Sequence, residues 1–209
     1  MGTKSKGGLL LPVVAVVAAV AYFAPEAARD VVGNLLPSDP VIIGVEAEAV
    51  MVADGAGDRV RQCTAAQVVS QKKCGDLKVI IMDAAKMPYI TRNIALAWGE
   101  GKDFILTRSS TPRDANYKAA CGGFVKKYTD GSCDEFAFAS TEQGGAGART
   151  EEVPSREQDC QGGTIGSAYR WQQIKAGDDF LVVISNPTKV ATKPYVGTDI
   201  AEDKTSCGI

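Results

Sequence analysis

Six cysteines constrain the fold of this chain more than any other feature. They are Cys63, Cys74, Cys121, Cys133, Cys160 and Cys207. An even number of cysteines in an exported chain indicates disulfide bonds, and six cysteines allow fifteen pairings. Pairing along the chain gives Cys63–Cys74 and Cys121–Cys133 and leaves Cys160–Cys207 to tie the tail. A zinc site is the weaker alternative, because the sequence contains no C-x2-C pair and no histidine.

The N-terminus has the pattern of an export or anchoring signal. Lys4 and Lys6 precede an uncharged run over residues 7–25, and Ala19-Val20-Ala21 offers a small-x-small cleavage pattern. The run is also close to the ~20 residues that span a bilayer, so an uncleaved anchor with membrane association through residues 7–25 is the alternative. Either reading delivers the rest of the chain outside the cytoplasm. We therefore expect a secreted or periplasmic protein.

The 209 residues, of which 45% are hydrophobic, suffice for one globular domain plus an appendage. Residues 1–24 are the predicted signal peptide or anchor. Residues 25–40, with three prolines, are the predicted linker, and residues 41–209 are the predicted domain.

Hydrophobic patterning within this domain predicts an α+β fold with a mixed or antiparallel sheet. The expected strands are 41–52, 77–82, 104–107 and 180–184, and the expected helices are 64–73, 88–98, 114–120 and 157–174. Segments 136–139 and 149–153 flank the glycine-rich turn 144–147 and are expected to form a β excursion. Four aromatic residues near these elements are expected in the core rather than as base-stacking platforms: Phe136, Phe138, Tyr169 and Trp171.

Charge is distributed unevenly along the chain. The net charge of −2 argues against a protein that coats nucleic acid through its overall field. Residues 86–127, however, contain eight basic and three acidic residues, a local charge of +5, whereas residues 130–159 carry −6. An acidic cluster beside a basic flank is able to hold a cation and a polyanion side by side. Two ordinary solvated faces are the alternative.

The absence of histidine limits the chemistry available to the chain. Acid–base catalysis or metal binding at neutral pH then depends on Asp, Glu, Asn and Gln. Such groups gather in CDEFAFASTEQGG at 133–145 and in EQDCQGG at 157–163. Magnesium is a metal that these oxygen ligands suit.

These two strings, with VPSR at 153–156, FLVVI at 180–184 and DAAKMPYITRNIALAWGEGKDFILTR at 83–108, resemble the long form of the NucA/NucB family of secreted deoxyribonucleases. The resemblance covers roughly residues 74–185. It implies a ββα-metal nuclease motif, in which an acidic residue replaces the usual histidine base, and Mg²⁺ or Mn²⁺ as the cofactor. It also implies DNA as the partner, cut without sequence preference.

The resemblance extends to single residues. Asp134 and Glu135 match the family's Asp-Glu pair, and one of them, preferably Asp134, is the expected water-activating base. Glu157 and Gln158 fall at the start of the metal-binding helix, with Gln161 in support. The site loop is Glu142, Gln143, Gly144 and Gly145, and the phosphate-binding candidates are Arg92, Arg108 and Arg113. For each arginine a surface salt bridge is the alternative, and for Glu157 the helix dipole alone explains its place near a helix start.

Two positions depart from the family pattern. Gln143 stands where Glu is usual, and Gln158 stands where Asn is usual. A Gln in place of Asn lengthens the arm by one methylene and moves a ligand atom by about 1.5 Å, which octahedral magnesium tolerates poorly. The expected function is thus an exported, metal-dependent DNA endonuclease. The alternative is a catalytically weakened homologue that binds nucleic acid or a partner at the envelope.

Overall fold

The structure, a computed structural model, describes residues 39–45, 48–205 and 207. The predicted signal or anchor at 1–24, and all but the last two residues of the predicted linker, lie outside these described residues. Within the described part of the chain, no helix has the length and apolar character needed to cross a membrane.

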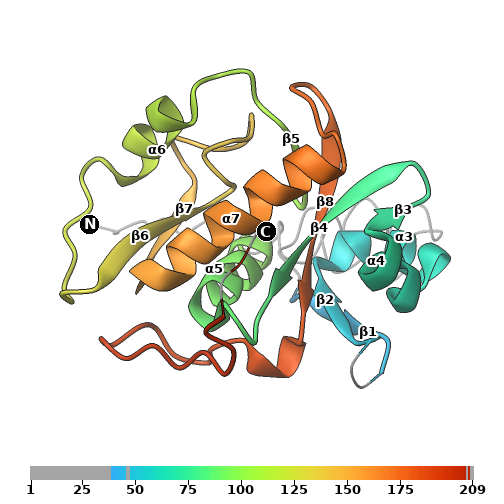
Figure 1. The fold of residues 1–209 in the computed structure, drawn as a ribbon, viewed down its shortest axis with the longest axis horizontal. Helices are drawn as coiled ribbons and strands as arrows, with labels where there is room; N and C mark the ends of the chain where they lie inside the picture. The colour runs from blue at the N-terminus through green and yellow to red at the C-terminus, as the bar shows by residue number, and fades with distance from the viewer. Residues whose placement is uncertain (1–38, 46–47, 206, 208–209) are drawn as a thin grey trace, which may run out of the picture. The chain divides into compact units, whose positions relative to one another are not determined.

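A mixed sheet forms the centre of the described domain (Figure 1). Strands β4 (Leu77–Asp83) and β8 (Asp179–Ser185) run parallel at its middle, and β3 (Lys73–Cys74) lies antiparallel along the outer edge of β4. The other edge of β8 is shared by β2 (Val50–Val52) and β5 (Ile105–Thr107), both antiparallel to it. Strand β1 (Val41–Ile43) extends the sheet beyond β2.

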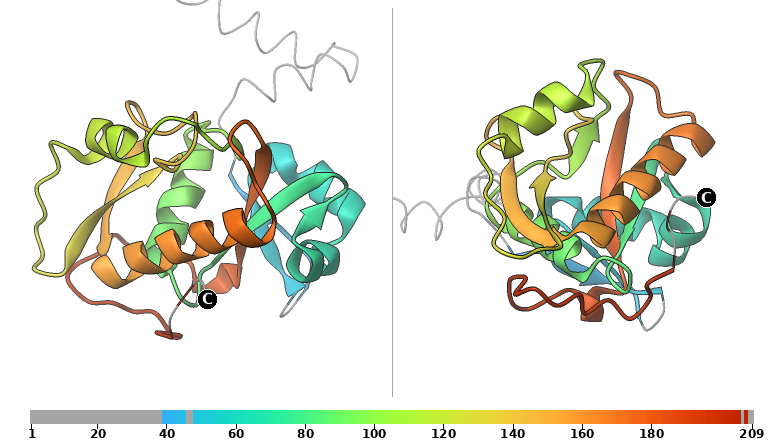
Figure 2. Two further views of the ribbon diagram at one scale, coloured as in Figure 1. Left: turned by 45° about the horizontal axis from the view of Figure 1, so that its top comes forward. Right: turned by 60° about the vertical axis from the view of Figure 1, so that its left-hand side comes forward.

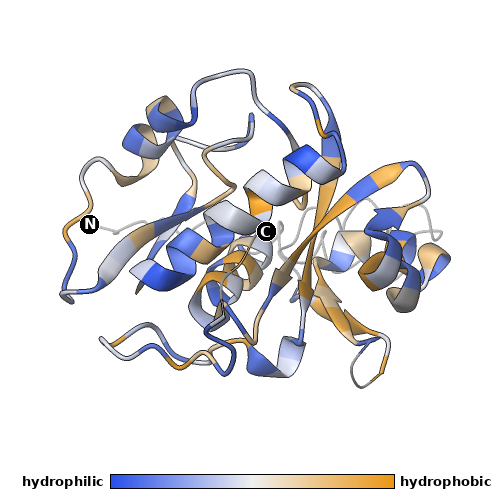
Figure 3. Cartoon of the chain, in the orientation of Figure 1, coloured by the Kyte–Doolittle hydropathy of each residue, from blue (hydrophilic) through white to orange (hydrophobic). Residues whose placement is uncertain are grey.

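The middle of each central strand, residues 79–82 of β4 and 180–184 of β8, is apolar because helices cover both faces of the sheet. Val79, Leu181 and Val183 pack with residues of α3 (Gly57–Cys63) and α4 (Ala65–Gln71). The alternate residues Ile80 and Val182 pack on the other side, where α5 (Pro88–Gly99) and α7 (Ser155–Trp171) lie. Figure 3 shows the result as a hydrophobic centre between helices that carry polar outer surfaces.

A two-stranded ribbon leads directly into α7. Strand β6 (Gly131–Phe136) pairs antiparallel with β7 (Arg149–Pro154), and α7 begins at the next residue. Helix α6 (Arg113–Cys121) lies beside β6, and Figure 2 shows the ribbon and α6 from two further sides. Short 3-10 helices at Asp54–Ala56 and Pro187–Lys189 complete the elements of the described residues. The predicted α+β class, with a ββα unit, is confirmed.

All three predicted disulfides are formed. Cys63–Cys74 joins α3 to β3, and Cys121–Cys133 joins α6 to β6. Cys160–Cys207 joins α7 to the C-terminal tail.

Most predicted elements are confirmed, but the bounds of two strands are wrong and one helix was missed. The single strand expected over 41–52 is the antiparallel pair β1–β2, because the chain turns after Ile43 at Gly44, whose φ of +88° favours glycine. Helix α3 was not predicted. The first arm of the ribbon ends at Phe136 instead of starting there, because the apolar run 136–139 turns into the core.

One aromatic residue lies where it was not expected. Phe136 and Phe138 are buried, and Tyr169 packs against the same core. Trp171, in contrast, is 77% exposed, so the core prediction is wrong for it. Trp171 is the last residue of α7, where the helix leaves the core.

Candidate functional site

The ββα unit places two neighbouring carboxyl groups on opposite faces of β6. Because side chains alternate along a strand, Asp134 faces α5 and α7, whereas Cys133 and Glu135 face the α6 side. Cys133 is bonded to Cys121 of α6, which ties α6 to the strand that carries both carboxyl groups.

Asp134 is fully buried, with 0% exposure, and amides hold both of its oxygens. Asn93 Nδ2 of α5 donates to Oδ2 at 2.8 Å, and Gln161 Nε2 of α7 donates to Oδ1 at 2.9 Å. Burial raises the pKa of Asp134 to about 6, while the bonds from Asn93 and Gln161 act in the opposite direction. Asn93 is itself fixed, because Arg149 donates to its Oδ1. Asp134 therefore sets the orientation of the Gln161 carboxamide.

Glu135 is 2% exposed, and it lines a cavity of about 310 Å³. Its Oε1 accepts a bond from the backbone N–H of Ala139 at 3.2 Å. Burial is the main reason that the pKa of Glu135 is raised to about 8, and the nearby charge of Asp134 raises it further. Arg113 lowers it, which indicates that this guanidinium lies near the carboxyl group.

The cavity combines cationic and oxygen-donor side chains. Arg108 and Arg113 line it together with Glu135 and Gln161. The Arg108 guanidinium donates to the carbonyl of Ile174 and lies 4.5 Å from the centre of the Tyr169 ring, so it is held in place. The remaining wall is built from the following residues: Ser109, Thr111, Phe138, Ala139, Ser140, Gly162, Ile165, Gly166 and Tyr169. Paired guanidinium groups suit the oxygens of a phosphodiester.

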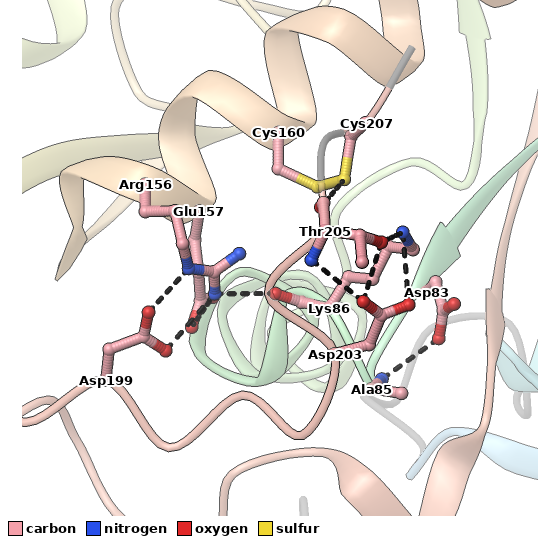
Figure 4. Close-up of a disulfide and its surroundings, with 10 residues drawn as sticks. All are labelled: Asp83, Ala85, Lys86, Arg156, Glu157, Cys160, Asp199, Asp203, Thr205 and Cys207. Atoms are coloured by element: carbon pink, nitrogen blue, oxygen red, sulfur yellow. Dashed lines mark hydrogen bonds and ion pairs between the residues drawn. A yellow bond between two sulfur atoms is a disulfide. The ribbon is translucent and has the colours of Figure 1, made fainter. Parts of the chain in front are cut away.

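Glu157 lies elsewhere, at the first turn of α7, and is fully buried (Figure 4). Its Oε2 accepts bonds from the backbone N–H groups of Tyr89 at 2.9 Å and Ile90 at 3.0 Å. These groups belong to the first turn of α5, whose N-cap residue, Met87, makes no side-chain cap bond. Glu157 thus caps α5 from another helix. Burial raises its pKa to about 8.

The C-terminal tail covers this turn. Arg156 Nε donates to Asp199 Oδ2 at 2.5 Å, and Lys86 Nζ lies 3.1 Å from Asp203 Oδ2 and donates to Thr205 Oγ1 at 2.6 Å. Figure 4 shows how these contacts and the Cys160–Cys207 disulfide hold the tail against α7 and the start of α5. We call residues 195–205, together with Cys207, the strap.

The other predicted residues are spread over several surroundings. Arg92 forms an ion pair with Glu151 and does not line the cavity. Glu142 is exposed, and Gln143 Oε1 accepts a bond from the N–H of Thr107 at 3.1 Å. Gly144 is required by packing, since a Cβ there would lie 2.1 Å from the carbonyl oxygen of Phe138, and Gly145 has a φ of +93°. None of the four site-loop residues lines the cavity beside Glu135.

The oxygen atoms that line the cavity determine which metal ions it can bind. Across the described residues, no three Asp, Glu or Cys side chains converge as a metal site. The cavity itself offers the carboxylate of Glu135 and the carboxamide of Gln161, whose oxygen receives no bond from any described residue. Mg²⁺ is commonly held by one or two carboxylates with water and phosphate oxygens as further ligands. The set fits such an ion chemically. Gln158 does not line the cavity, and its Oε1 is a buried atom without a hydrogen-bond partner in the described part of the chain.

Sequence reasoning missed Asn93 and Tyr169 as site residues. Asn93 had a detectable signal, because it occupies a core-facing position of the predicted helix 88–98, three residues after Ile90 and one before Ile94. A polar residue on an apolar helix face requires a buried partner, and here that partner is Asp134. Tyr169 had no local signal, since its contact with Arg108 depends on the folded chain.

A larger hollow, about 840 Å³, lies around the Cys63–Cys74 disulfide and the Lys78–Asp178 ion pair. It contains none of the predicted catalytic, metal-binding or phosphate-binding residues. The smaller cavity beside Glu135 is therefore the better candidate site on chemical grounds.

One known family matches part of the chain. Residues 102–183 match the family model described as Deoxyribonuclease NucA/NucB. No curated protein matches the chain. The matched span runs from just before β5 into β8 and contains every residue that lines the cavity beside Glu135.

Proposed function

We propose that the chain is an exported, metal-dependent endonuclease, because residues 102–183 match the family model described as Deoxyribonuclease NucA/NucB. It hydrolyses the phosphodiester bonds of DNA without sequence preference. The observation that carries the proposal is the meeting of two guanidinium groups, a carboxyl group and a carboxamide in one cavity.

Arg108 and Arg113 bind the non-bridging oxygens of the scissile phosphate in this proposal. The guanidinium of Arg108 is already fixed by Tyr169 and by the carbonyl of Ile174, so little side-chain entropy is lost on binding. Contacts to phosphate carry no base information, which supports cleavage without sequence preference.

Glu135, rather than Asp134, is the general base that accepts a proton from the reacting water. The carboxyl group of Asp134 is sealed from the cavity by the amides of Asn93 and Gln161, whereas Glu135 lines the cavity. In the ion-free protein its pKa of about 8 keeps this carboxyl group mostly protonated at neutral pH, and a cation held beside it would favour the ionised form that accepts the proton of water. Asp134 is then a positioning residue, which holds Gln161 with its carboxamide nitrogen inward.

Glu135 and Gln161 are the residues that would hold a divalent cation such as Mg²⁺ or Mn²⁺. When bound, such an ion would polarise the phosphate and lower the pKa of water. A carboxylate has two oxygens, so Glu135 can bind an ion through one and accept the proton of water through the other.

Three disulfides support an oxidising compartment for the folded chain. The predicted signal or anchor at residues 1–24 is the segment that would direct export.

The test is cleavage of plasmid DNA by the disulfide-intact protein in Mg²⁺ or Mn²⁺. We expect nicking that EDTA stops and that Glu135→Gln reduces by at least about 100-fold. Absence of cleavage in both metals would overturn the proposal.

Binding without cleavage is a second candidate function, favoured by the presence of only one carboxyl group in the wall of the cavity. Restoring the family's residues with Gln143→Glu and Gln158→Asn separates the two functions. Cleavage that appears only in the restored protein would identify the natural chain as a nucleic-acid-binding homologue.

A further inference from the structure

A second hollow, of about 240 Å³, lies along the far flank of α7. It is lined by Lys72, Ile80, Ile81, Thr164, Ser167, Ala168, Trp171 and Gln172, and we call it the Trp171 groove. Cavity residues 162, 166 and 169 and groove residues 164, 168 and 171 lie on opposite sides of α7, because a helix turns once in 3.6 residues. The same helix thus separates the candidate site from the groove.

Trp171 is the unusual member of this groove. It is 77% exposed, whereas the other tryptophan of the chain, Trp98, is 3% exposed. An indole left in water loses the free energy that its burial would give, so an exposed tryptophan beside a hollow marks a contact surface.

The charges around the groove favour an anionic ligand. Lys72 lines the groove, and Arg170 is an exposed neighbour whose Nη2 donates to Ser167 Oγ at 3.2 Å. Neither cation forms an ion pair with a carboxylate in the described part of the chain, and no Asp or Glu lines the groove.

We propose that Trp171 is a stacking platform for a nucleobase of the DNA strand whose phosphate occupies the cavity beside Glu135, with Lys72 and Arg170 contacting the intervening backbone. This inference rests on the proposed function and extends it by one binding site. Stacking on an aromatic ring is tolerant of base identity, because every base has a π face, and this agrees with cleavage that ignores sequence.

The spacing sets the reach of this site. Gln161 and Trp171 are ten residues apart on α7, which is about 15 Å along the axis. The strand must also cross α7, whose diameter with side chains is about 10–12 Å. At about 3.4 Å per phosphate, the base on Trp171 is therefore at least about four nucleotides from the cleaved bond. Substrates shorter than this cannot reach it.

The experiment uses the full chain, with disulfides intact, and a single-stranded oligonucleotide of about 20 nucleotides in EDTA, so that binding is observed without cleavage. Trp171 is the exposed fluorophore, and we expect saturable quenching of its emission that Trp171→Phe abolishes. By anisotropy of a labelled oligonucleotide, Trp171→Ala should weaken Kd by roughly 5- to 100-fold, and Trp171→Phe should restore most of the affinity. Ile42→Ala, which shortens an exposed apolar side chain on β1, is the control and should leave Kd unchanged.

Steady-state cleavage assays separate a binding role of Trp171 from a purely structural one, because only the binding role should change KM in a way that depends on strand length. Because the contact is remote from the reacting bond, Trp171→Ala should raise KM with kcat unchanged on long strands and change neither on strands shorter than about four nucleotides. Lack of quenching, or equal Kd for the natural protein and Trp171→Ala, would overturn the inference. Quenching without any cleavage in metal would instead overturn the nuclease proposal and leave the nucleotide site in place.

Discussion

The start and the middle of α7 differ in what their polar side chains do. Glu157 and Gln161 are four residues apart, so they lie on the same side of the helix. Glu157 is sealed under the strap, and its carboxyl group caps α5. Gln161 lines a cavity that also contains Arg108, Arg113 and Glu135. Coverage by a distant part of the chain thus distinguishes Glu157, which binds backbone N–H groups, from Gln161, which lines the cavity.

Glu135→Gln should have the largest effect on DNA cleavage, because it changes a residue in the cavity. Loss of the carboxylate should reduce kcat by about 10²–10⁴-fold, because a positioned general base contributes that much. The melting temperature in EDTA should change little, because a pKa of about 8 leaves this buried carboxyl group mostly protonated at neutral pH and a carboxamide is similar to it in size and neutral. Steady-state cleavage and thermal melting measure both, with Glu157→Gln as the matched control that keeps kcat. Equal loss of activity in the two variants would erase the distinction between the two regions.

Removal of the Cys160–Cys207 disulfide tests the region around Glu157 that the strap covers. The two cysteines are 47 residues apart, and loop-closure entropy gives about 4 kcal/mol of stabilisation for such a link. Cys160→Ser with Cys207→Ser should therefore lower the melting temperature by roughly 10 °C, while the folded fraction still cleaves DNA. The matched control is the Cys63→Ser, Cys74→Ser pair, which closes a separation of only 11 residues and should cost about 3 kcal/mol. A larger loss from the control pair would contradict the role of the strap.

The pH dependence of stability sharpens the same comparison. Glu157 has a pKa of about 8 in the folded chain against an ordinary value of 4.5, so the folded state binds a proton that the unfolded state releases. Its stabilising contribution is complete below pH 4.5 or so and is lost as pH rises through about 8. Glu157→Gln should flatten this fall in urea-unfolding free energy between pH 5 and 8 by an amount of the order of 1 kcal/mol. An unchanged slope would show that Glu157 is ionised throughout.

Gly166→Ala should have the smallest effect, with opposite signs for stability and activity. A Cβ at Gly166 would meet only the far end of Arg170, at 3.8 Å, and alanine is favoured over glycine in a helix by about 0.8–1.0 kcal/mol. The melting temperature should rise by about 2–4 °C. Activity should fall, because the methyl group enters the cavity that Gly166 lines.

Gly99→Ala, at the end of α5 and outside the cavity wall, is the control for that change. It should be neutral or stabilising without any loss of activity. Unimpaired cleavage by Gly166→Ala would mean that substrate does not approach this part of α7.

Local patterns in the sequence predicted much of the fold. The apolar runs of β4 and β8 and the periodic spacing of Ile90, Ile94 and Trp98 in α5 are set by neighbours along the chain, so they are readable without a structure. The three disulfides match the pairing of neighbouring cysteines, although the sequence alone did not distinguish it from the other fourteen pairings.

What could not be predicted depends on contacts between distant segments. Nothing near Glu157 in the sequence indicates that the strap covers it, or that its partners are the backbone N–H groups of Tyr89 and Ile90. The orientation of the two carboxyl groups on β6 likewise depends on which helices lie against each face. The exposure of Trp171 follows from where α7 ends relative to the core, which its composition does not reveal.

The most direct test of the account is the shift in melting temperature caused by Mg²⁺ or Mn²⁺ in the natural protein, in Glu135→Gln and in Glu157→Gln. An ion that binds only the folded state raises the melting temperature with its concentration. We predict a shift in the natural protein and in Glu157→Gln that disappears in Glu135→Gln. A shift that persists in Glu135→Gln and disappears in Glu157→Gln would contradict the assignment of the ion to the cavity.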